Sequence, residues 1–464
     1  MAKSISRISK LLVDRNGIAP EVVLARRRRF SISLRLGDDV AGSRSLQLAA
    51  LTASRLIVRC FPGAVRVQAT DAVLDAPALV GAPLGSSLRK ALAGEVGKKG
   101  FASGPTQQVM LFGNVAHDGS AMRVTYDGWV GAAGPEAQLS RYAERERCSL
   151  APILAAALAV SEIFLAFARI DLQATRRVVD LSLWRPDLNT DDPEALGPAV
   201  TFLPKRAWLL GLGHLGNAYL WALATMPYAR PDDLLLNLID FDKVETTNIE
   251  TGVLFRRRDV GHLKTRVCSS WLKQFGIETR LTERRFDEHF VRGDDEPALA
   301  LSGFDNNEAR HHLVGAGFGK VADSGLGGMA TNFDSIGVRT WPNTRSASDV
   351  WPLISTQERE EANAAIEAAA AANAGYRRLN RGACGLVELA GKSVAVPFVG
   401  MTAATLVLAD VLRVLHDGGK IENFKLRLGS VADGVDVVWS ANGGDDLAAV
   451  DYTTAAALSG PPTS

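Results

Sequence analysis

The most chemically informative stretch of this chain is a glycine-rich turn followed by an aspartate. An apolar segment, Trp208–Leu210, leads into GLGHLG at residues 211–216, and a second apolar segment, Leu234–Ile239, ends in Asp240. Glycines allow a tight turn, a helix N-terminus favours an anion, and an acid after the second strand can hold ribose hydroxyls. The pattern predicts the nucleotide-binding half of a Rossmann-like unit, which dehydrogenases also share. The glycines of the turn are Gly211, Gly213 and Gly216.

The residues after Asp240 narrow this reading. Asp242 and Asn248 lie in DFDKVETTN (residues 240–248), and Lys264 ends DVGHLK (residues 259–264). Asp242 and Asn248 can also be read as caps of a turn or helix. Lys264 can be read as a solvated lysine at a helix start. His214, inside the turn, is interpreted as a spacer and not as a catalyst.

A further polar cluster follows the short apolar segment Leu299–Ser302, which predicts a strand. Asp305 opens the motif FDNNEAR (residues 304–310), and Arg310 could orient its loop. In open α/β sheets ligands bind at the carboxyl ends of strands, so Asp305 is a candidate ligand residue. A plain turn signal is the alternative. The segment Lys320–Asp323 predicts the next strand.

Composition predicts a soluble globular protein of two or three domains. The chain has 464 residues, with 47% hydrophobic and 22% charged residues. The net charge of +1 gives no reason to expect nucleic acid or a membrane as the main partner. The N-terminus lacks the apolar core of a signal peptide, so we expect a cytoplasmic location. The apolar segment Leu150–Phe167 is interpreted as a buried helix.

The four cysteines are widely spaced and form no C-x-x-C pair. This argues against a disulfide framework and against a four-cysteine zinc site, so no zinc is expected. We expect Cys60 and Cys268 to be core residues. Cys148 is a weak candidate nucleophile.

Similar segments recur in the same order along the chain, which predicts two domains of the same architecture. The first half has a helical pattern at Ser45–Arg59, a strand pattern at Ala64–Ala69 and a long apolar helix at Ser149–Ile170. The second half has a comparable long apolar helix at Val394–Leu415. The first half has no G-x-G-x-x-G motif, so we interpret it as a degenerate domain of the same fold. An unrelated α/β domain is the alternative.

The order GLGHLG, DFDKVETTN, DVGHLK, FDNNEAR and VADSGLGG resembles the adenylating domain of the ubiquitin-activating enzyme superfamily, which has a ThiF/MoeB-like fold. The resemblance covers about residues 205–445. It implies an α/β fold with two Rossmann-like adenylation-type domains, the first degenerate and the second active. The expected parts are a degenerate domain (1–190), a linker (191–204) in a stretch rich in proline and acid, an active domain (205–450) and a flexible tail (451–464).

The resemblance also implies chemistry: ATP and Mg²⁺ would be used to adenylate the C-terminal glycine carboxylate of a ubiquitin-like protein. A lysine on the phosphates would offset charge that develops in transfer, and Mg²⁺ prefers carboxylate and phosphate oxygens. Carried over from the family, the glycines would cradle the nucleotide, and the other roles would fall to Asp240 (ribose), Asn248 and Lys264 (phosphates), Asp305 (Mg²⁺), Asp242 (close to the nucleotide) and Arg310 (the Asp305 loop).

The chain departs from the family pattern at one arginine. The family commonly has Arg-Gln shortly after the asparagine, where this chain has Thr251 and Gly252. Arg256–Arg258 could substitute, or could be a solvated edge. In the family a second arginine comes from the partner domain, and Arg26–Arg29 are candidates here.

The conjugating branch of this superfamily adds a cysteine, to which the adenylate is passed as a thioester. Cys384 is the candidate nucleophile, because it lies between small residues with Arg381 nearby to favour thiolate. It belongs to a predicted excursion over about residues 343–391 that could move over the adenylate. A buried or incidental cysteine is the alternative.

A fused pair of such domains is similar to the activating enzymes of bacterial ubiquitin-like conjugation systems, which are linked to anti-phage defence. The resemblance implies a ubiquitin-like protein and a conjugating enzyme as partners, and a homodimer is possible. Two alternatives stay open: a sulfur-carrier-protein adenylyltransferase without a thioester step, and a binding scaffold whose nucleotide site has decayed.

Overall fold

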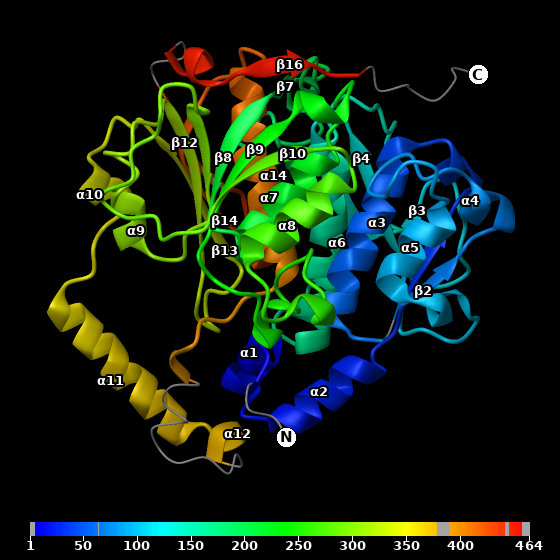
Figure 1. The fold of residues 1–464 in the computed structure, drawn as a ribbon. Coiled ribbons are helices and arrows are strands. Elements are labelled where there is room, and N and C mark those ends of the chain that lie inside the picture. The colour runs from blue at the N-terminus through cyan, green and yellow to red at the C-terminus, as the bar shows by residue number, and fades with distance from the viewer. Residues whose placement is uncertain (1–4, 64, 378–389, 441–444, 457–464) are drawn as a thin grey trace.

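The computed structural model describes residues 5–63, 65–377, 390–440 and 445–456 (Figure 1). Two large sheets, one from each half of the chain, dominate the fold. The protein is thus a mixed α/β molecule, in agreement with the expected fold class. We refer to residues 1–190 as the first half and to residues 205–450 as the second half.

The sheet of the first half has six strands in the order β2-β1-β3-β4-β5-β6. The first four are parallel to one another, while β5 and β6 run antiparallel. The strands are β1 (Ile32–Leu36), β2 (Val65–Gln68), β3 (Gln108–Phe112), β4 (Met122–Asp127), β5 (Val130–Pro135) and β6 (Val179–Ser182).

The sheet of the second half has eight strands in the order β10-β9-β8-β11-β12-β13-β14-β15. It is parallel from β10 to β12 and antiparallel beyond. The strands are β8 (Arg206–Leu210), β9 (Leu235–Ile239), β10 (Glu278–Thr282), β11 (Leu299–Ser302), β12 (Lys320–Leu326), β13 (Ser335–Trp341), β14 (Ile421–Arg427) and β15 (Asp436–Trp439).

The two sheets share one topology once the edge strands β10 and β15 are set aside. In both, the first two strands of the half are neighbours, two more parallel strands follow on the other side of the first, and two antiparallel strands complete the order. Corresponding helices follow: α3 (Arg44–Cys60) after β1, like α7 (His214–Ala224) after β8, and α6 (Leu150–Ala168) between β5 and β6, like α14 (Pro397–Val414) between β13 and β14. This arrangement is the repeat that the sequence suggested.

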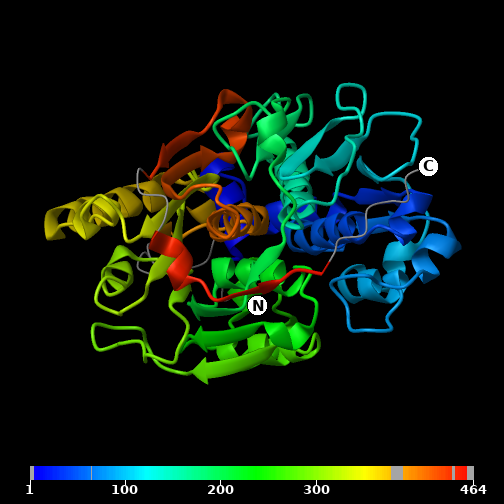
Figure 2. The ribbon, with the colours of Figure 1, turned by 90° about the horizontal axis from the view of Figure 1, so that it is seen from above.

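Four of these helices form the shared core. α6 packs on α3 and α14, and α14 packs on α7, so α6 and α14 lie side by side in the middle of the molecule (Figure 1). From above, α14 is seen almost end-on near the centre (Figure 2). Both α6 and α14 are long and apolar enough to cross a membrane, but 89% and 94% of their apolar windows are buried inside the protein. The interpretation of 150–167 as a buried helix is therefore confirmed.

A buried ion cluster fixes α14 to the sheet of the second half. Asp410 Oδ2 lies 2.8 Å from Lys320 Nζ at the start of β12, and Asp410 Oδ1 lies 3.2 Å from Arg413 of the same helix. Asp410 Oδ1 also accepts the backbone N–H of Ile421, at the start of β14, at 3.0 Å. Because buried charges are tolerated only when they are paired, this cluster fixes the helix against both strands.

The smaller helices lie around this core. They are α1 (Arg7–Asn16), α2 (Pro20–Arg29), α4 (Asp71–Asp75), α5 (Leu88–Val96), α8 (Lys264–Lys273), α9 (Asn307–His311), α10 (Ala347–Val350), α11 (Thr356–Ala372) and α12 (Ala374–Arg377).

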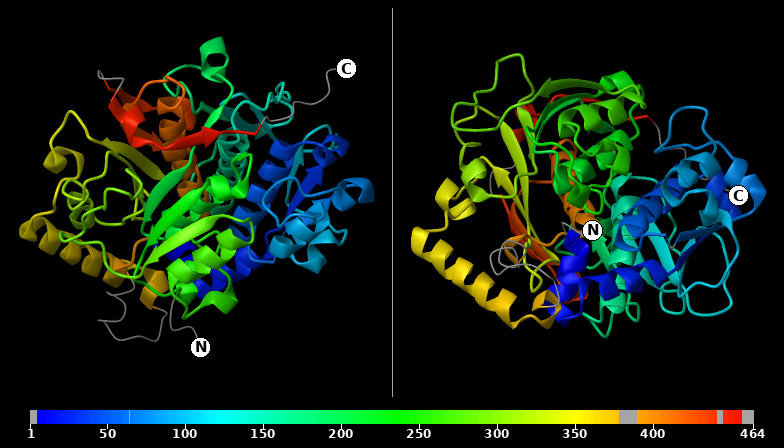
Figure 3. Two further views of the ribbon diagram at one scale, coloured as in Figure 1. Left: turned by 45° about the horizontal axis from the view of Figure 1, so that its top comes forward. Right: turned by 60° about the horizontal axis from the view of Figure 1, so that its bottom comes forward.

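The excursion between β13 and α14 leaves the second half and returns to the first. Its long helix, α11, runs along the outside of the molecule, largely exposed (Figure 3). At its end Asn373 donates to the Val13 carbonyl at 3.0 Å, and the Tyr376 hydroxyl donates to Asp14 in α1. The excursion therefore connects the sheet of the second half to the first helix of the chain.

The linker and the tail are more ordered than predicted. Part of the linker forms β7 (Phe202–Pro204), and β16 (Tyr452–Thr454) pairs with it antiparallel. The backbone N–H of Ala455 also donates to Thr201 at 2.8 Å. The prediction of a flexible tail from residue 451 is thus wrong for β16, because its small polar sequence hid a strand partner far away in the chain. Residues 457–464 lie outside the described residues.

Candidate active site

Three loops meet at the carboxyl ends of β8, β9 and β11. The N–H of Gly211 donates to Ile239 at 2.9 Å, and that of Gly303 donates to Leu210 at 2.8 Å. Gly211 has a φ of +82°, which favours glycine. A Cβ on Gly216 would lie 2.2 Å from the Gly211 carbonyl. The glycine turn (residues 211–216) therefore closes only because these positions lack side chains.

Gly213 differs from the other glycines of the turn, because no described atom lies within 4 Å of where its Cβ would be. It immediately precedes α7, whose first backbone N–H groups have no partner within the helix. Such an open helix N-terminus suits a phosphate, so the predicted nucleotide cradle fits the local structure.

Asp240 organises the loops around the glycine turn. Its Oδ2 accepts the N–H of Leu212 at 2.7 Å, and its Oδ1 accepts the N–H of Asp242 at 2.8 Å. Burial raises the pKa of Asp240, and the charge of Lys264 partly offsets that effect. Each carboxylate oxygen keeps a second lone pair, with which it can accept a hydroxyl.

Lys264 is brought to the same place by α8, of which it is the first residue. Its N–H donates to the Asp242 carbonyl at 3.0 Å. Its Nζ lies 2.7 Å from Asp242 Oδ2 and 3.8 Å from Asp240 Oδ2. The lysine side chain is largely buried, with 9% exposed. The structure thus joins Lys264, Asp240 and Asp242 beside the glycine turn, and the solvated alternative for Lys264 does not hold.

Asn248 caps a turn, which was the alternative to its predicted role on a phosphate. It ends a short 3₁₀ turn, where its Oδ1 accepts the N–H of Glu245 at 2.8 Å. Its amide nitrogen remains available to a ligand. Its role on a phosphate stays a prediction.

Asn217 is a site residue that sequence reasoning missed. It is fully buried in α7. Its Nδ2 donates to the carbonyls of Leu212 and Gly213 at 2.8 and 3.0 Å, and its Oδ1 accepts the N–H of Leu254 at 3.0 Å. One amide therefore fastens the glycine turn to the loop at residues 250–256. A polar residue in the apolar run LGNAYLWALA was the available signal.

The loop at residues 250–256, called the clamped loop below, explains the departure from the family's Arg-Gln. Thr251 is buried, and a Cβ on Gly252 would lie 2.4 Å from Phe255. Two arginines of α3 donate to its carbonyls: Arg59 Nε to Gly252 at 3.2 Å and Arg55 to Val253 at 3.0 Å. A long side chain at residue 252 has no room, because the first half holds this loop.

Arg256 points away from the glycine turn. Its guanidinium lies 3.1 Å from the buried Glu95 of α5, which also pairs with Arg55 at 2.6 Å and with Arg59 at 3.2 Å. Arg256 thus pairs with the first half here, and the replacement of the missing family arginine by one of Arg256–Arg258 stays a prediction. The Arg256 side chain contributes to the joint between the two halves.

Among the arginines at 26–29, only Arg27 is buried. It donates to the Cys60 and Arg59 carbonyls at 2.8 Å each and pairs with Glu250 at 2.9 Å. Arg27 therefore supports the clamped loop and is not free to act elsewhere. The other three are exposed along α2.

Another arginine of the first half lies nearer to the glycine turn. Arg7, in α1, donates to Ser393 Oγ at 3.0 Å, just before α14. Burial lowers the pKa of His214 to about 4, and the charge of Arg7 acts in the same direction. His214 packs against α14, where a Cβ on Gly400 would lie 2.5 Å from its Nε2. His214 is thus a neutral packing residue, as its interpretation as a spacer expected.

Asp305 lies on the exposed loop after β11, and Arg310 holds that loop as predicted. Arg310 donates to the Phe304 carbonyl at 2.6 Å, to Asn307 Oδ1 at 3.0 Å and to the buried Asp323 at 3.0 Å. The carboxylate of Asp305 has one modest contact, from Asn306 at 3.3 Å. Asp305 therefore keeps oxygens free for a cation, whereas Arg310 serves as a brace.

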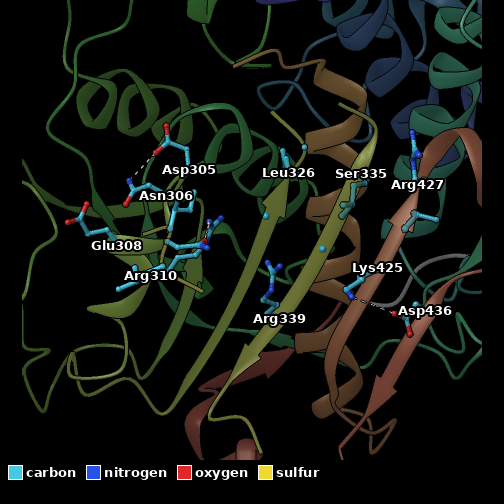
Figure 4. A pocket seen from close by; sticks show the side chains of 18 of the residues that line it. Asp305, Asn306, Glu308, Arg310, Leu326, Ser335, Arg339, Lys425, Arg427 and Asp436 are labelled. Atoms are coloured by element: carbon cyan, nitrogen blue, oxygen red, sulfur yellow. Dashed lines mark hydrogen bonds and ion pairs between the residues drawn. The ribbon is translucent and has the colours of Figure 1, made fainter. Parts of the chain in front are cut away.

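A cavity of about 890 Å³ begins at Asp305 and runs over β12, β13 and β14. Figure 4 shows Asp305 and Arg310 at one side of it, Arg339 in the middle, and Lys425 at the other side. Leu353 and Ile354, which are 58% and 62% exposed, also line it. The cavity thus connects the Asp305 loop with a broad, open stretch of sheet.

Comparison with known proteins shows the family of this chain. Residues 31–183 match the BilD N-terminal domain and residues 203–418 match the BilD C-terminal domain. The "Bacterial E1-like protein BilD" of Collimonas sp. (strain OK412) is 34% identical over 423 residues, which cover 90% of each chain. This chain belongs to the BilD family.

Two solved structures, MccB and PaaA, show low similarity to this BilD-family chain. E. coli MccB in complex with MccA is 15% identical, with a TM-score of 0.35, and covers 70% of this chain and 95% of its own. PaaA is 17% identical, with a TM-score of 0.33, and covers 51% of this chain and 72% of its own.

The cysteines divide into two groups. Cys60, Cys148 and Cys268 are buried and free, and burial raises the pKa of each thiol, that of Cys148 to about 12. Thiols of this kind form little thiolate at neutral pH, so Cys148 is not a suitable nucleophile. Cys384 and Arg381 lie outside the described residues. In the part of the chain that is described, no group of three or more His, Cys, Asp or Glu could hold a metal ion.

Proposed function

We propose that this BilD-family protein uses ATP and Mg²⁺ to adenylate the C-terminal carboxylate of a ubiquitin-like protein. The observation that carries the proposal is the joining of Lys264 and Asp240 beside the glycine turn, where Gly211 lies against Gly303 and Phe304, just before the Asp305 at which the cavity begins. A nucleotide cradle and a groove for a polypeptide end thus share one edge of the sheet.

Each residue of the site has a task that its surroundings support. Gly213 and the N-terminus of α7 bind phosphate, and Asp240 accepts ribose hydroxyls while it holds the glycine turn. Lys264 offsets negative charge, and its contact with Asp242 holds its side chain in place. Asp305 would hold Mg²⁺ together with phosphate oxygens. Bound ATP supplies the α-phosphate that the substrate carboxylate attacks.

The arginine that the partner domain supplies in the family has a candidate here in Arg7. It comes from the first half, as the second arginine of such sites does, and its charge is felt at His214 in the glycine turn. Its contact with Ser393 is exposed, so the side chain can move toward a nucleotide.

The cavity over β12–β14 would take the C-terminal segment of the substrate protein. Glycine backbone forms part of its lining, at Gly325, Gly327, Gly337 and Gly434. The exposed Leu353 and Ile354 give an extended chain an apolar wall. The carboxyl end would then reach Asp305 and the glycine turn.

We further propose that Cys384 takes the activated carboxylate as a thioester and passes it to a conjugating enzyme, in bacterial anti-phage defence. The other three cysteines are buried with raised pKa values, which leaves Cys384 as the candidate. The excursion that carries it starts beside the cavity and reaches α1. An adenylyltransferase without a thioester step is the alternative.

A gel shift tests both steps. The protein is mixed with ATP, Mg²⁺ and the neighbouring ubiquitin-like protein, and reducing and non-reducing gels are compared. A heavier band that reductant removes and that Cys384→Ala lacks would support the thioester, with Cys268→Ala as the matched control. Pyrophosphate exchange without a band would leave adenylation alone. If both the band and pyrophosphate exchange are absent, the proposal is overturned and a decayed scaffold is favoured.

A further inference from the structure

The cations that line the cavity over β12–β14 are unequally satisfied. Arg310 pairs with Asp323 at 3.0 Å, Arg427 with Asp334 at 3.2 Å, and Lys425 with Asp436 at 3.9 Å. Arg339, half-buried on β13 between them, has no hydrogen bond or ion pair to any described residue (Figure 4). An arginine that is half removed from water without a counter-charge is costly, unless an anion joins it at some stage.

The sheet is shaped to hold this guanidinium. Gly325 of β12 faces Gly337 of β13 in the antiparallel register. A Cβ at Gly325 would lie 2.9 Å from Arg339 Nη1, and one at Gly337 would lie 3.6 Å from it. Arg339 therefore lies over a facing glycine pair that gives it room. Its planar fork is held ready for a bidentate partner.

The nearest acid does not neutralise it. Burial lowers the pKa of Arg339, and Asp323 only partly opposes this effect. Asp323 already accepts from Arg310 Nε at 3.0 Å and from Trp351 Nε1 at 3.0 Å. The middle of the cavity therefore carries an excess of about one positive charge.

The surroundings favour a peptide carboxylate over a phosphate. β13 lies two strands beyond β11 in the sheet. It is therefore roughly 10 Å away, across the sheet, from the strand that leads to Asp305. The neighbouring walls are glycine backbone and the exposed Leu353 and Ile354. Arg359 of α11 also lines the cavity without an ion pair to a described residue, but it is exposed, so Arg339 is the half-buried guanidinium that a peptide carboxylate can neutralise.

We infer that Arg339 pairs with an aspartate or glutamate side chain in the C-terminal segment of the substrate protein, some residues before its last glycine. This inference rests on the proposed function, because it assigns the cavity to that segment. Arg339 is then a specificity residue: it selects tails with an acidic side chain at one position and plays no part in the transfer step.

The test is pyrophosphate exchange stimulated by synthetic peptides that end in glycine. Each position before the glycine is fixed in turn as Asp, Asn or Lys, and the other positions are mixed. We expect wild type to prefer Asp over Asn about tenfold at one position, since hydrogen bonds to charged groups are worth about that factor. Arg339→Gln should lose the preference and Arg339→Lys should keep part of it. Arg280→Gln, on the exposed edge strand β10, should behave as wild type.

The inference would be overturned by no acidic preference in wild type, by an unchanged preference in a folded Arg339→Gln, or by no stimulation by any peptide. A raised KM for ATP in Arg339→Gln with unchanged peptide selection would also overturn it, since Arg339 would then serve the nucleotide. The proposed function falls only if the whole ubiquitin-like protein also gives neither pyrophosphate exchange nor a thioester band. Thermal unfolding of each variant separates loss of recognition from loss of fold.

Discussion

Arg59 donates its Nε–H to the carbonyl of Gly252, 3.2 Å away, and so a residue of the first half holds the loop on which the second half's nucleotide site rests. The same guanidinium contacts Glu95 at 3.2 Å and donates to the Val253 carbonyl. Through Leu254 and Asn217 this support continues to the glycine turn. The first half therefore acts on the site through hydrogen bonds, whether or not it binds a nucleotide itself.

The first prediction concerns this joint. We expect Arg59→Ala to lower the free energy of unfolding by about 3 kcal/mol, because it removes one partner of a buried ion cluster, and to raise the KM for ATP. Thermal unfolding and ATP-dependent pyrophosphate exchange measure the two effects. Arg66→Ala, which removes only an exposed contact to the Lys99 carbonyl, is the control. A folded Arg59→Ala with wild-type KM would contradict the coupling.

The second prediction concerns Lys264. Lys264→Ala should reduce pyrophosphate exchange by about 10²–10³-fold, because it removes a preorganised positive charge from the site. The fold should survive, since Asp242 is half-exposed and can be solvated. Lys273→Ala, at the other end of α8 and exposed, should leave exchange unchanged. Equal rates for the two variants would remove Lys264 from the mechanism.

The third prediction concerns Asp305. Asp305→Asn should raise the Mg²⁺ concentration that gives half-maximal exchange by about tenfold or more, because an amide oxygen is a weaker ligand for a hard cation. Since the carboxylate is exposed and Arg310 holds the loop through other atoms, stability should stay within about 0.5 kcal/mol. Asp294→Asn, on another exposed loop, is the matched control. A reduced rate with an unchanged Mg²⁺ dependence would contradict the assignment.

The fourth prediction is a pH dependence of stability. Burial and the charge of Arg7 lower the pKa of His214 to about 4, whereas the unfolded value is about 6.5. The unfolded chain therefore binds more protons between these values, so stability falls as pH drops from about 6.5 toward 4, by at most about 3 kcal/mol. Urea unfolding at pH 7.5 and pH 5 measures the loss. His214→Asn should show a smaller loss than wild type, and an equal loss would show that other groups cause it.

The fifth prediction concerns the buried cluster under α14. Burial alone would raise the pKa of Asp410, but Lys320 and Arg413 lower it below its ordinary value. Asp410→Asn leaves those cations without their carboxylate and should cost about 3–5 kcal/mol of stability at neutral pH. The wild-type contribution is present above the ordinary aspartate pKa and is lost as pH falls through the lowered one. Asp417→Asn, an exposed residue with a φ of +56°, should be neutral or slightly stabilising.

Sequence reasoning located the elements around the glycine turn closely. β11 begins and ends where it was expected, and β8 and β9 lie within a few residues of their predicted bounds. These elements carry strong local signals, because parallel strands buried on both faces are continuous apolar runs. Asp240 and Asp305 also follow strand ends, so the topology alone brings these two residues to one edge.

Other parts depended on partners far away in the chain. β13 and β14 line the cavity. They alternate polar and apolar residues, and the sequence analysis did not predict them. The direction of Arg256 depends on Glu95, which lies in α5 of the other half. No local pattern contains that information.

The shared strand order of the two halves has a consequence for genetics. At the end of β1, where the glycine turn would be, Asp39 accepts from Asn114 and pairs with Arg141, so acidic groups occupy the place of an anion. Because the two halves belong to one peptide chain, every second half is synthesised together with the first half that supports its site. A support-deficient allele and a chemistry-deficient allele, expressed together, should therefore fail to rescue each other.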